Sequence, residues 1–77
     1  MTGTTGGPAT ERLAAAGRDI AKAKALIVRQ EILVARLAAV GGDVTRARQA
    51  LEAMRRSLRE LYLRRRLIVE EAETASR

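Results

Sequence analysis

Apolar residues recur at intervals of three and four positions through most of this chain, the spacing of one face of an α-helix. In the second half the two intervals alternate from Val44 to Ala75, with Arg65 as the one polar residue in the series. That alternation is typical of helices that pack side by side at a shallow angle. The positions concerned are Val44, Ala47, Leu51, Met54, Leu58, Leu61, Arg65, Ile68, Ala72 and Ala75. We expect one long helix here, over residues 44–76.

The first half is apolar on two sides, over a helix that we expect at residues 8–40. One stripe contains Leu13, Ile20, Ala23, Leu26, Ile27, Leu33, Val34, Leu37 and Val40. A second stripe contains Ala21, Ala25, Val28, Ile32, Ala35 and Ala39. A single neighbouring helix covers one stripe only, so the second predicts another contact surface. The alternative is a solvated face rich in alanine, a good helix former, but Val28 and Ile32 at its centre favour the interface.

A short polar break, Gly41-Gly42-Asp43, separates the two halves. Glycine readily takes the left-handed conformation that ends a helix, and aspartate accepts hydrogen bonds from the free amides of the next helix. So short a connection, over residues 41–43, makes the helices antiparallel neighbours, with positions whose numbers sum to about 84 opposite each other. The predicted fold is all-α: an antiparallel, coiled-coil-like hairpin over residues 8–77. Residues 1–7 are expected to form a flexible tail.

Size favours self-association of this hairpin. The chain has 77 residues and no cysteine, so no disulfide supports a core that is small at this length. We therefore expect a homo-oligomer, a dimeric four-helix bundle first of all, or a contact with a different protein. Besides the second stripe, the candidate interface includes three apolar residues off the seam of the second helix: Tyr62, Leu63 and Leu67.

Two polar residues fall on the predicted seams. Gln30 is expected opposite Met54, and Arg65 opposite Asp19. An Asp19–Arg65 ion pair would fix the register of the hairpin. Alternatively, Arg65 extends its charge past the core into solvent.

The chain is basic, with a formal net charge of +6. This offers an alternative function, in which arginines of the second helix bind a phosphate backbone. The candidate contacts are Arg55, Arg56, Arg59, Arg64 and Arg66. Interleaved glutamates and the lack of an aromatic platform for bases disfavour this alternative. Association with an anionic membrane surface is also disfavoured, because Trp and Phe are absent, and no membrane span is expected.

Catalytic and cofactor chemistry find little support in the composition. There is no histidine and no cysteine, so the commonest general base and the thiolate nucleophile are both missing. We expect no enzyme activity, no metal and no cofactor. No secretory signal is recognised, and a cytoplasmic bacterial protein is the expectation. The function favoured by the sequence is a protein–protein interaction or structural module.

The central run from Ile27 to Leu58 resembles a set of short alphaproteobacterial proteins of uncharacterised function. Their pattern is an RQxxLxARL helix, a GxD turn and a second helix with heptad spacing. The matching residues are Arg29, Gln30, Leu33, Ala35, Arg36, Leu37, Gly41, Asp43, Ala47 and Leu51. Those proteins often have histidine where this chain has Gly42, and an aromatic residue near Met54, so no role of either is transferred. The resemblance implies a helical hairpin and no activity.

Overall fold

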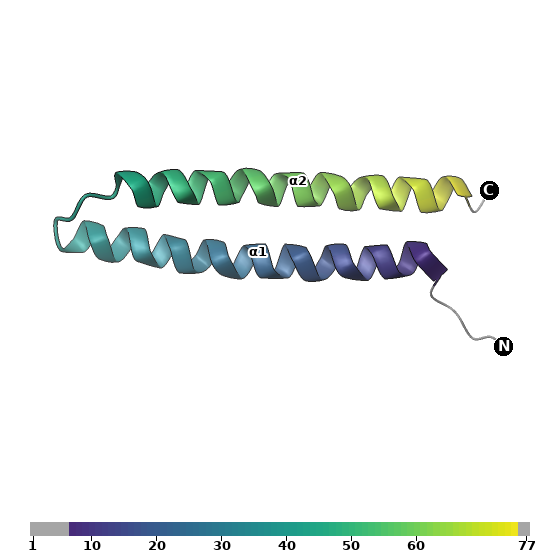
Figure 1. The fold of residues 1–77 in the computed structure, drawn as a ribbon, viewed down its shortest axis with the longest axis horizontal. Helices are drawn as coiled ribbons and strands as arrows, with labels where there is room; N and C mark the ends of the chain where they lie inside the picture. The colour runs from purple at the N-terminus through teal and green to yellow at the C-terminus, as the bar shows by residue number, and fades with distance from the viewer. Residues whose placement is uncertain (1–6, 76–77) are drawn as a thin grey trace.

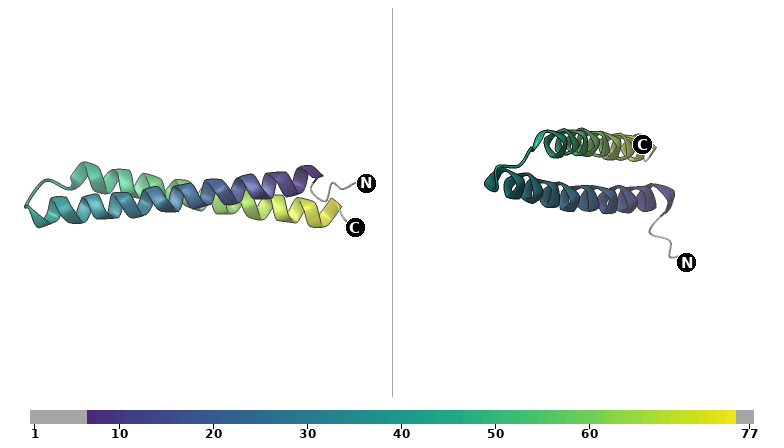
Figure 2. Two further views of the ribbon diagram at one scale, coloured as in Figure 1. Left: turned by 90° about the horizontal axis from the view of Figure 1, so that it is seen from below. Right: turned by 60° about the vertical axis from the view of Figure 1, so that its left-hand side comes forward.

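The chain folds into two long antiparallel helices (Figure 1). The computed structural model describes residues 7–75. Helix α1 spans Gly7–Ala39 and helix α2 spans Thr45–Ala75, within a body measuring 60 × 22 × 11 Å. The two helices cross at a shallow angle when seen from below (Figure 2, left). The predicted all-α hairpin is therefore confirmed.

Both helix boundaries differ slightly from the expected ones. Helix α1 begins one residue before Pro8 and ends one residue before Val40, while α2 begins at Thr45. The connection is therefore 40–44, longer than the expected 41–43. Of the tail expected over residues 1–7, only Gly7 is described, and it opens α1. Ser76 lies outside the described residues.

The end of α1 is a Schellman motif centred on Gly41. The amide of Gly42 donates to the carbonyl of Leu37 at 2.8 Å, and the amide of Gly41 donates to the carbonyl of Ala38 at 3.1 Å. Gly41 has a φ of 73°, the left-handed conformation that this motif requires at its turning residue. The motif satisfies two carbonyls that the end of a helix otherwise leaves free. The sequence predicted that the two glycines end the helix, and it is the left-handed conformation of Gly41 that does so.

The start of α2 is closed by Asp43. Its Oδ1 accepts a hydrogen bond from the amide of Thr45 at 2.9 Å. That bond favours the ionised carboxylate and holds the pKa of Asp43 below its ordinary value of 3.8. The carboxylate also lies at the positive end of the α2 dipole. Asp43 therefore satisfies one free amide of α2 from two positions before it.

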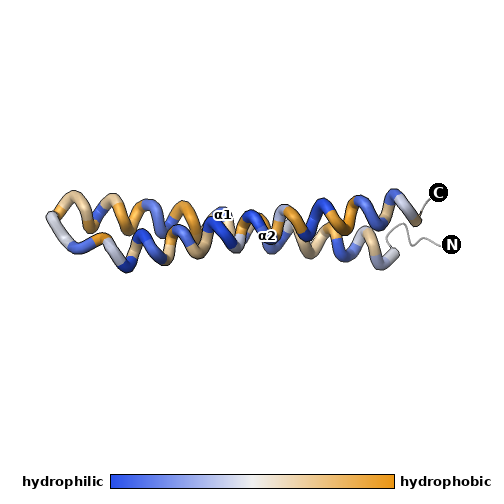
Figure 3. The backbone as a smooth tube through the Cα atoms, turned by 90° about the horizontal axis from the view of Figure 1, so that it is seen from above, coloured by the Kyte–Doolittle hydropathy of each residue, from blue (hydrophilic) through white to orange (hydrophobic). Residues whose placement is uncertain are grey.

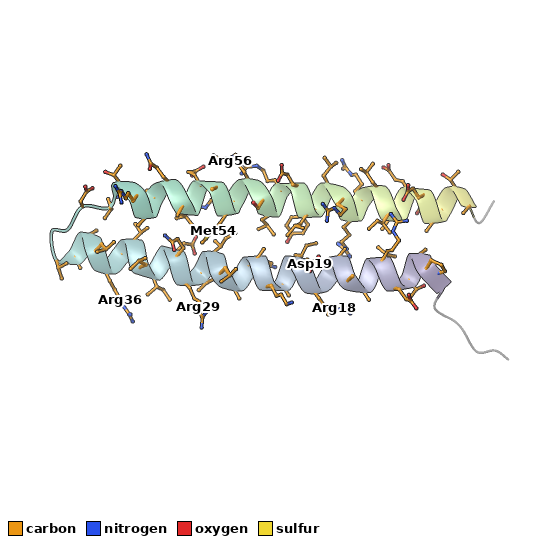
Figure 4. The ribbon with its side chains drawn as sticks, viewed as in Figure 1. Arg18, Asp19, Arg29, Arg36, Met54 and Arg56 are labelled. Carbon is orange, nitrogen blue, oxygen red and sulfur yellow. The ribbon has the colours of Figure 1, made fainter. Side chains whose placement is uncertain are left out.

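The interface between the helices follows a heptad seam. The buried residues are Ala16, Ile20 and Ile27 of α1 and Ala47, Leu51 and Ile68 of α2. Leu13, Ala23, Gln30, Val34 and Leu37 are half-buried and continue the α1 series at intervals of three and four. Met54 lies between the helices as a partly buried filler (Figure 4). The seam of α2 therefore matches the predicted spacing, apart from Arg65 and the terminal Ala75, which are both exposed.

The α1 seam differs from the first predicted stripe at three leucine and valine positions. Leu26, Leu33 and Val40 are 49%, 45% and 80% exposed, so their expected burial is wrong. Leu26 and Leu33 precede the seam residues Ile27 and Val34 by one position, which turns them about 100° around the helix. They flank the seam, while the smaller Ala16 and Ala23 and the polar Gln30 lie on it between the larger apolar residues.

The resulting core is thin for the amount of apolar surface in the chain. Among the described residues only four large apolar side chains are buried, Ile20, Ile27, Leu51 and Ile68, and none falls below 2% exposure. Eight large ones are exposed: Leu26, Val28, Ile32, Leu33, Val40, Tyr62, Leu63 and Leu67. Figure 3 shows hydrophobic stretches recurring along the full length of both helices, between the hydrophilic ones. One hairpin leaves more of these large side chains in water than it buries.

Candidate interaction surfaces

The second stripe of α1 forms an exposed surface, which we name the α1 outer face. It consists of Ala21, Ala25, Val28, Ile32, Ala35 and Ala39, all of them exposed. At 3.6 residues per turn these positions lie about 150° around α1 from the seam. Val28 is 53% and Ile32 45% exposed at the centre of the face. Because α2 lies on the opposite side of α1, nothing within the hairpin covers this face.

Charged residues border the α1 outer face on both sides. On one side are Lys22, Arg29 and Arg36, and the latter two extend from α1 away from α2 (Figure 4). On the other side are Lys24 and Glu31. The result is an apolar strip with a polar rim, which is the composition of a protein–protein contact. Its small alanine side chains allow another helix to approach closely.

The three candidate residues of α2 do not join the α1 outer face. Leu63 is 54% and Leu67 51% exposed, and both lie on the side of α2 away from its seam. Arg56, one heptad before Leu63, points away from α1 in the same direction (Figure 4). Tyr62, 42% exposed, lies beside the seam instead. The residues expected to form one interface therefore divide between opposite faces of the hairpin, and we name Leu63 and Leu67 the α2 outer patch.

Of the five arginines proposed for phosphate binding, Arg55 is engaged within the hairpin. Its guanidinium lies 3.1 Å from the Glu31 carboxylate of α1 and 3.3 Å from the Glu52 carboxylate of α2. It is half-buried, unlike the rest of the set. The others are exposed, and in residues 7–75 they make no ion pair: Arg56, Arg59, Arg64 and Arg66. The structure thus leaves a smaller basic surface than the sequence predicts.

Polar contacts between the helices fix their register. The Gln30 side-chain amide donates to the carbonyl of Ala47 at 2.9 Å, so its partner is the α2 backbone, although the sequence placed Gln30 opposite Met54. Near the open end, Arg12 and Glu71 lie 3.1 Å apart, and both remain more than half exposed. This pair places a cation beside the acidic end of α2, where the helix dipole disfavours carboxylates. Exposed pairs of this kind contribute only tenths of a kcal/mol.

The other seam pair considered from the sequence does not form. Asp19 and Arg65 are both exposed, and neither takes part in an ion pair with the described part of the chain. Its exposure places Arg65 in solvent, as in the second interpretation of that position. The polar contacts across the seam are therefore the Gln30 hydrogen bond and the flanking ion pairs.

No other kind of site is found in residues 7–75. No three metal-ligating side chains gather there, and neither helix is apolar over a stretch long enough to cross a membrane. Comparison of the chain with protein-family models, with curated proteins and with solved structures finds no match. The two apolar surfaces and the exposed arginines are the features on which a function can be proposed.

Proposed function

We propose that this protein is a non-enzymatic interaction module that works by helical self-association through the α1 outer face. The supporting observation is the exposure of Val28 and Ile32 in the middle of a continuous apolar strip, on a hairpin whose own core is thin. Exposed apolar area of this kind on a small protein marks a contact surface. A second copy is the simplest occupant of this face, because every copy of the chain carries an identical apolar strip that can cover it. The setting we propose is the bacterial cytoplasm.

The geometry indicates how such a dimer would be built. Since the α1 outer face lies nearly opposite the seam, two copies that meet there place their helices in the order α2, α1, α1, α2. The four-helix bundle is then layered, with α1 of each copy in the middle. A stable contact of standard size buries about 800 Å² of each partner. One chain exposes 5991 Å², so about one-seventh of its surface is enough.

The test is the solution mass of the wild type and of Ile32→Glu, measured by sedimentation equilibrium at high salt. We expect twice the 8.4 kDa of one chain for the wild type and a shift to the monomer for the variant, because the glutamate carboxylate would be buried without a partner. Gln49→Glu is the matched control, since it adds the same charge at an exposed position of α2 outside both apolar surfaces. An unchanged mass for Ile32→Glu would remove the interface.

Binding of a nucleic-acid backbone is the second candidate function. It is favoured by the exposure of Arg56, Arg59 and Arg66 without ion pairs in the described part of the chain. Such binding is independent of base sequence and weakens steeply with salt, because bound counterions are released. A mobility-shift titration of duplex DNA and of RNA at two salt concentrations tests it. Retention that disappears in Arg59→Ala with Arg66→Ala, while the dimer persists, would establish this function.

A further inference from the structure

Charges on the outer side of α2 are ordered along the helix. Arg56 and Arg59 lie before the α2 outer patch, and Glu70 lies one turn after it. All three are exposed, and none makes an ion pair with another described residue. Glu60 also lies at the first end, but the two arginines there leave that end net basic. A helix surface that is net basic at one end, apolar in the middle and acidic at the other is complementary to itself in the antiparallel orientation.

Two open grooves lie along the same side of α2, one at the basic end and one at the acidic end. An open groove of about 320 Å³ is lined by Arg56, Arg59, Glu60 and Leu63. Another, of about 450 Å³, is lined by Leu67, Glu70, Glu71, Thr74 and Ala75. Each groove contains one leucine of the α2 outer patch, and between the two leucines runs about one turn of helix. Ridges of one helix pack into grooves of this kind on another.

We propose that α2 of a second copy docks on the α2 outer patch in the antiparallel orientation, around a two-fold axis that passes between Leu63 and Leu67. Leu63 then packs against Leu67 of the second copy, and the reverse contact forms by symmetry. With the axis there, Arg59 and Glu70 of the second copy lie within about 2 Å of the same level along the helices. Each groove with two arginines and Glu60 then faces the groove with Glu70 and Glu71 of the second copy.

Charge selects this orientation over the parallel one. Two parallel copies would place each Arg59 beside its own counterpart, and each Glu70 likewise, which is unfavourable. The antiparallel contact forms the Arg59–Glu70 pair twice. Arg64 and Arg66 lie at the same distance from the axis, on either flank of the patch, and each faces its own counterpart. Glu60 also lies at the level of Glu70 of the second copy. These like-charge contacts oppose the two Arg59–Glu70 pairs. A contact held by exposed ion pairs around two leucine layers is weak and sensitive to salt.

This contact is independent of the proposed α1 interface, because the two surfaces lie on opposite faces of the hairpin. When both operate, every copy has two neighbours, and the copies form a row that lengthens with concentration. Salt shortens the row to the dimer held by α1, since the α1 outer face is apolar. Loss of one contact leaves the other in place, so each can fail alone.

Cross-linking tests the orientation directly, since the chain has no cysteine of its own. Equimolar Arg59→Cys and Glu70→Cys copies, distinguished by a mass tag, are mixed at about 0.1 M salt and oxidised. The mixed dimer retains the second Arg59–Glu70 pair intact. We expect mixed disulfides to exceed either homodimer at least tenfold, because like positions lie at least about 15 Å apart in the antiparallel contact.

Gln49→Cys mixed with Glu70→Cys is the control. In the proposed contact, residue 49 of one copy lies about 16 Å along the helix axis from Glu70 of the other copy, too far for a disulfide. Circular dichroism confirms that each cysteine variant retains its helices. Predominant Arg59→Cys homodimers would overturn the proposal in favour of a parallel contact. A yield of mixed disulfide no greater than that of the control would overturn it altogether.

Sedimentation equilibrium at about 0.1 M and about 1 M salt completes the test. We expect Leu67→Glu to remain a dimer at both salts, and Ile32→Glu to dimerise at the lower salt only. Arg59→Glu and Glu70→Arg should each weaken the low-salt association of Ile32→Glu about tenfold, and together restore it. If the double charge-reversal variant associates no more strongly than either single variant, the proposed Arg59–Glu70 pairing is overturned, whatever the state of the α1 interface.

Discussion

One substitution, glycine to alanine, is expected to have opposite effects at two positions of this hairpin. At Gly17 and at Gly41 a new Cβ would meet no atom within 4 Å, so steric crowding is absent at both. The two differ in backbone conformation: Gly17 lies inside α1 with ordinary helical geometry, while Gly41 has a φ of 73°. The pair therefore isolates the cost of the left-handed conformation.

The magnitudes follow from the two environments. Alanine in a helix interior is favoured over glycine by about 1 kcal/mol, so Gly17→Ala should raise the free energy of unfolding by that amount. At Gly41 the left-handed conformation costs a residue with a Cβ about 1–2 kcal/mol. Restriction of the unfolded chain offsets about 0.4–1 kcal/mol of this cost. We expect Gly41→Ala to lower the free energy of unfolding by roughly 1 kcal/mol.

Thermal unfolding followed by circular dichroism measures both effects. For a domain of this size 1 kcal/mol corresponds to about 4–8 °C, so the midpoint should rise by that much in Gly17→Ala and fall in Gly41→Ala. The protein concentration must be equal throughout, because association shifts the midpoint. Midpoints that move in the same direction would refute the assignment of Gly41 as the residue that ends α1.

Three further predictions concern polar residues. Asp43→Asn removes a titrating carboxyl whose pKa is lowered in the folded chain. The stability that the Asp43 carboxylate contributes is complete above its ordinary pKa and disappears as pH falls through the lowered pKa. In urea titrations, the wild type should therefore lose more stability than the variant between about pH 5 and about pH 2. Gln30→Ala removes the bond to the Ala47 carbonyl and should lower the free energy of unfolding by about 1 kcal/mol in the same assay; no change would show that the bond does not hold the seam. Arg66→Ala should strengthen the proposed low-salt association by removing one of the like-charge contacts near the two-fold axis, and weaker association, measured by sedimentation, would contradict that arrangement.

The sequence predicted the hairpin because its signals are local. Gly41 and Asp43 act through their own backbone conformation and nearest amides, which a short motif reveals. The α2 seam could be predicted because arginines and glutamates occupy much of the rest of that helix. Few alternative faces could have been buried there.

The α1 seam was harder to predict because α1 is apolar on several sides. Leu26 and Leu33 are more hydrophobic than Ala16 or Gln30, yet the heptad spacing brings the smaller and polar pair to the seam. Hydrophobicity alone cannot choose among such faces, since the choice depends on how closely the two backbones approach. For the same reason the sequence grouped the α2 outer patch with the α1 outer face, although the fold points them in opposite directions.

The central claim is that one hairpin cannot cover its own apolar surface and is completed by another copy. The most direct test is the thermal unfolding midpoint of the wild type at high salt over a hundredfold range of protein concentration. Because only a folded chain could present the proposed interface, we predict that the midpoint rises steadily with concentration. A midpoint that stays constant over the whole range, with unchanged helicity, would show that the single hairpin is stable with Val28 and Ile32 in water, and would contradict the claim.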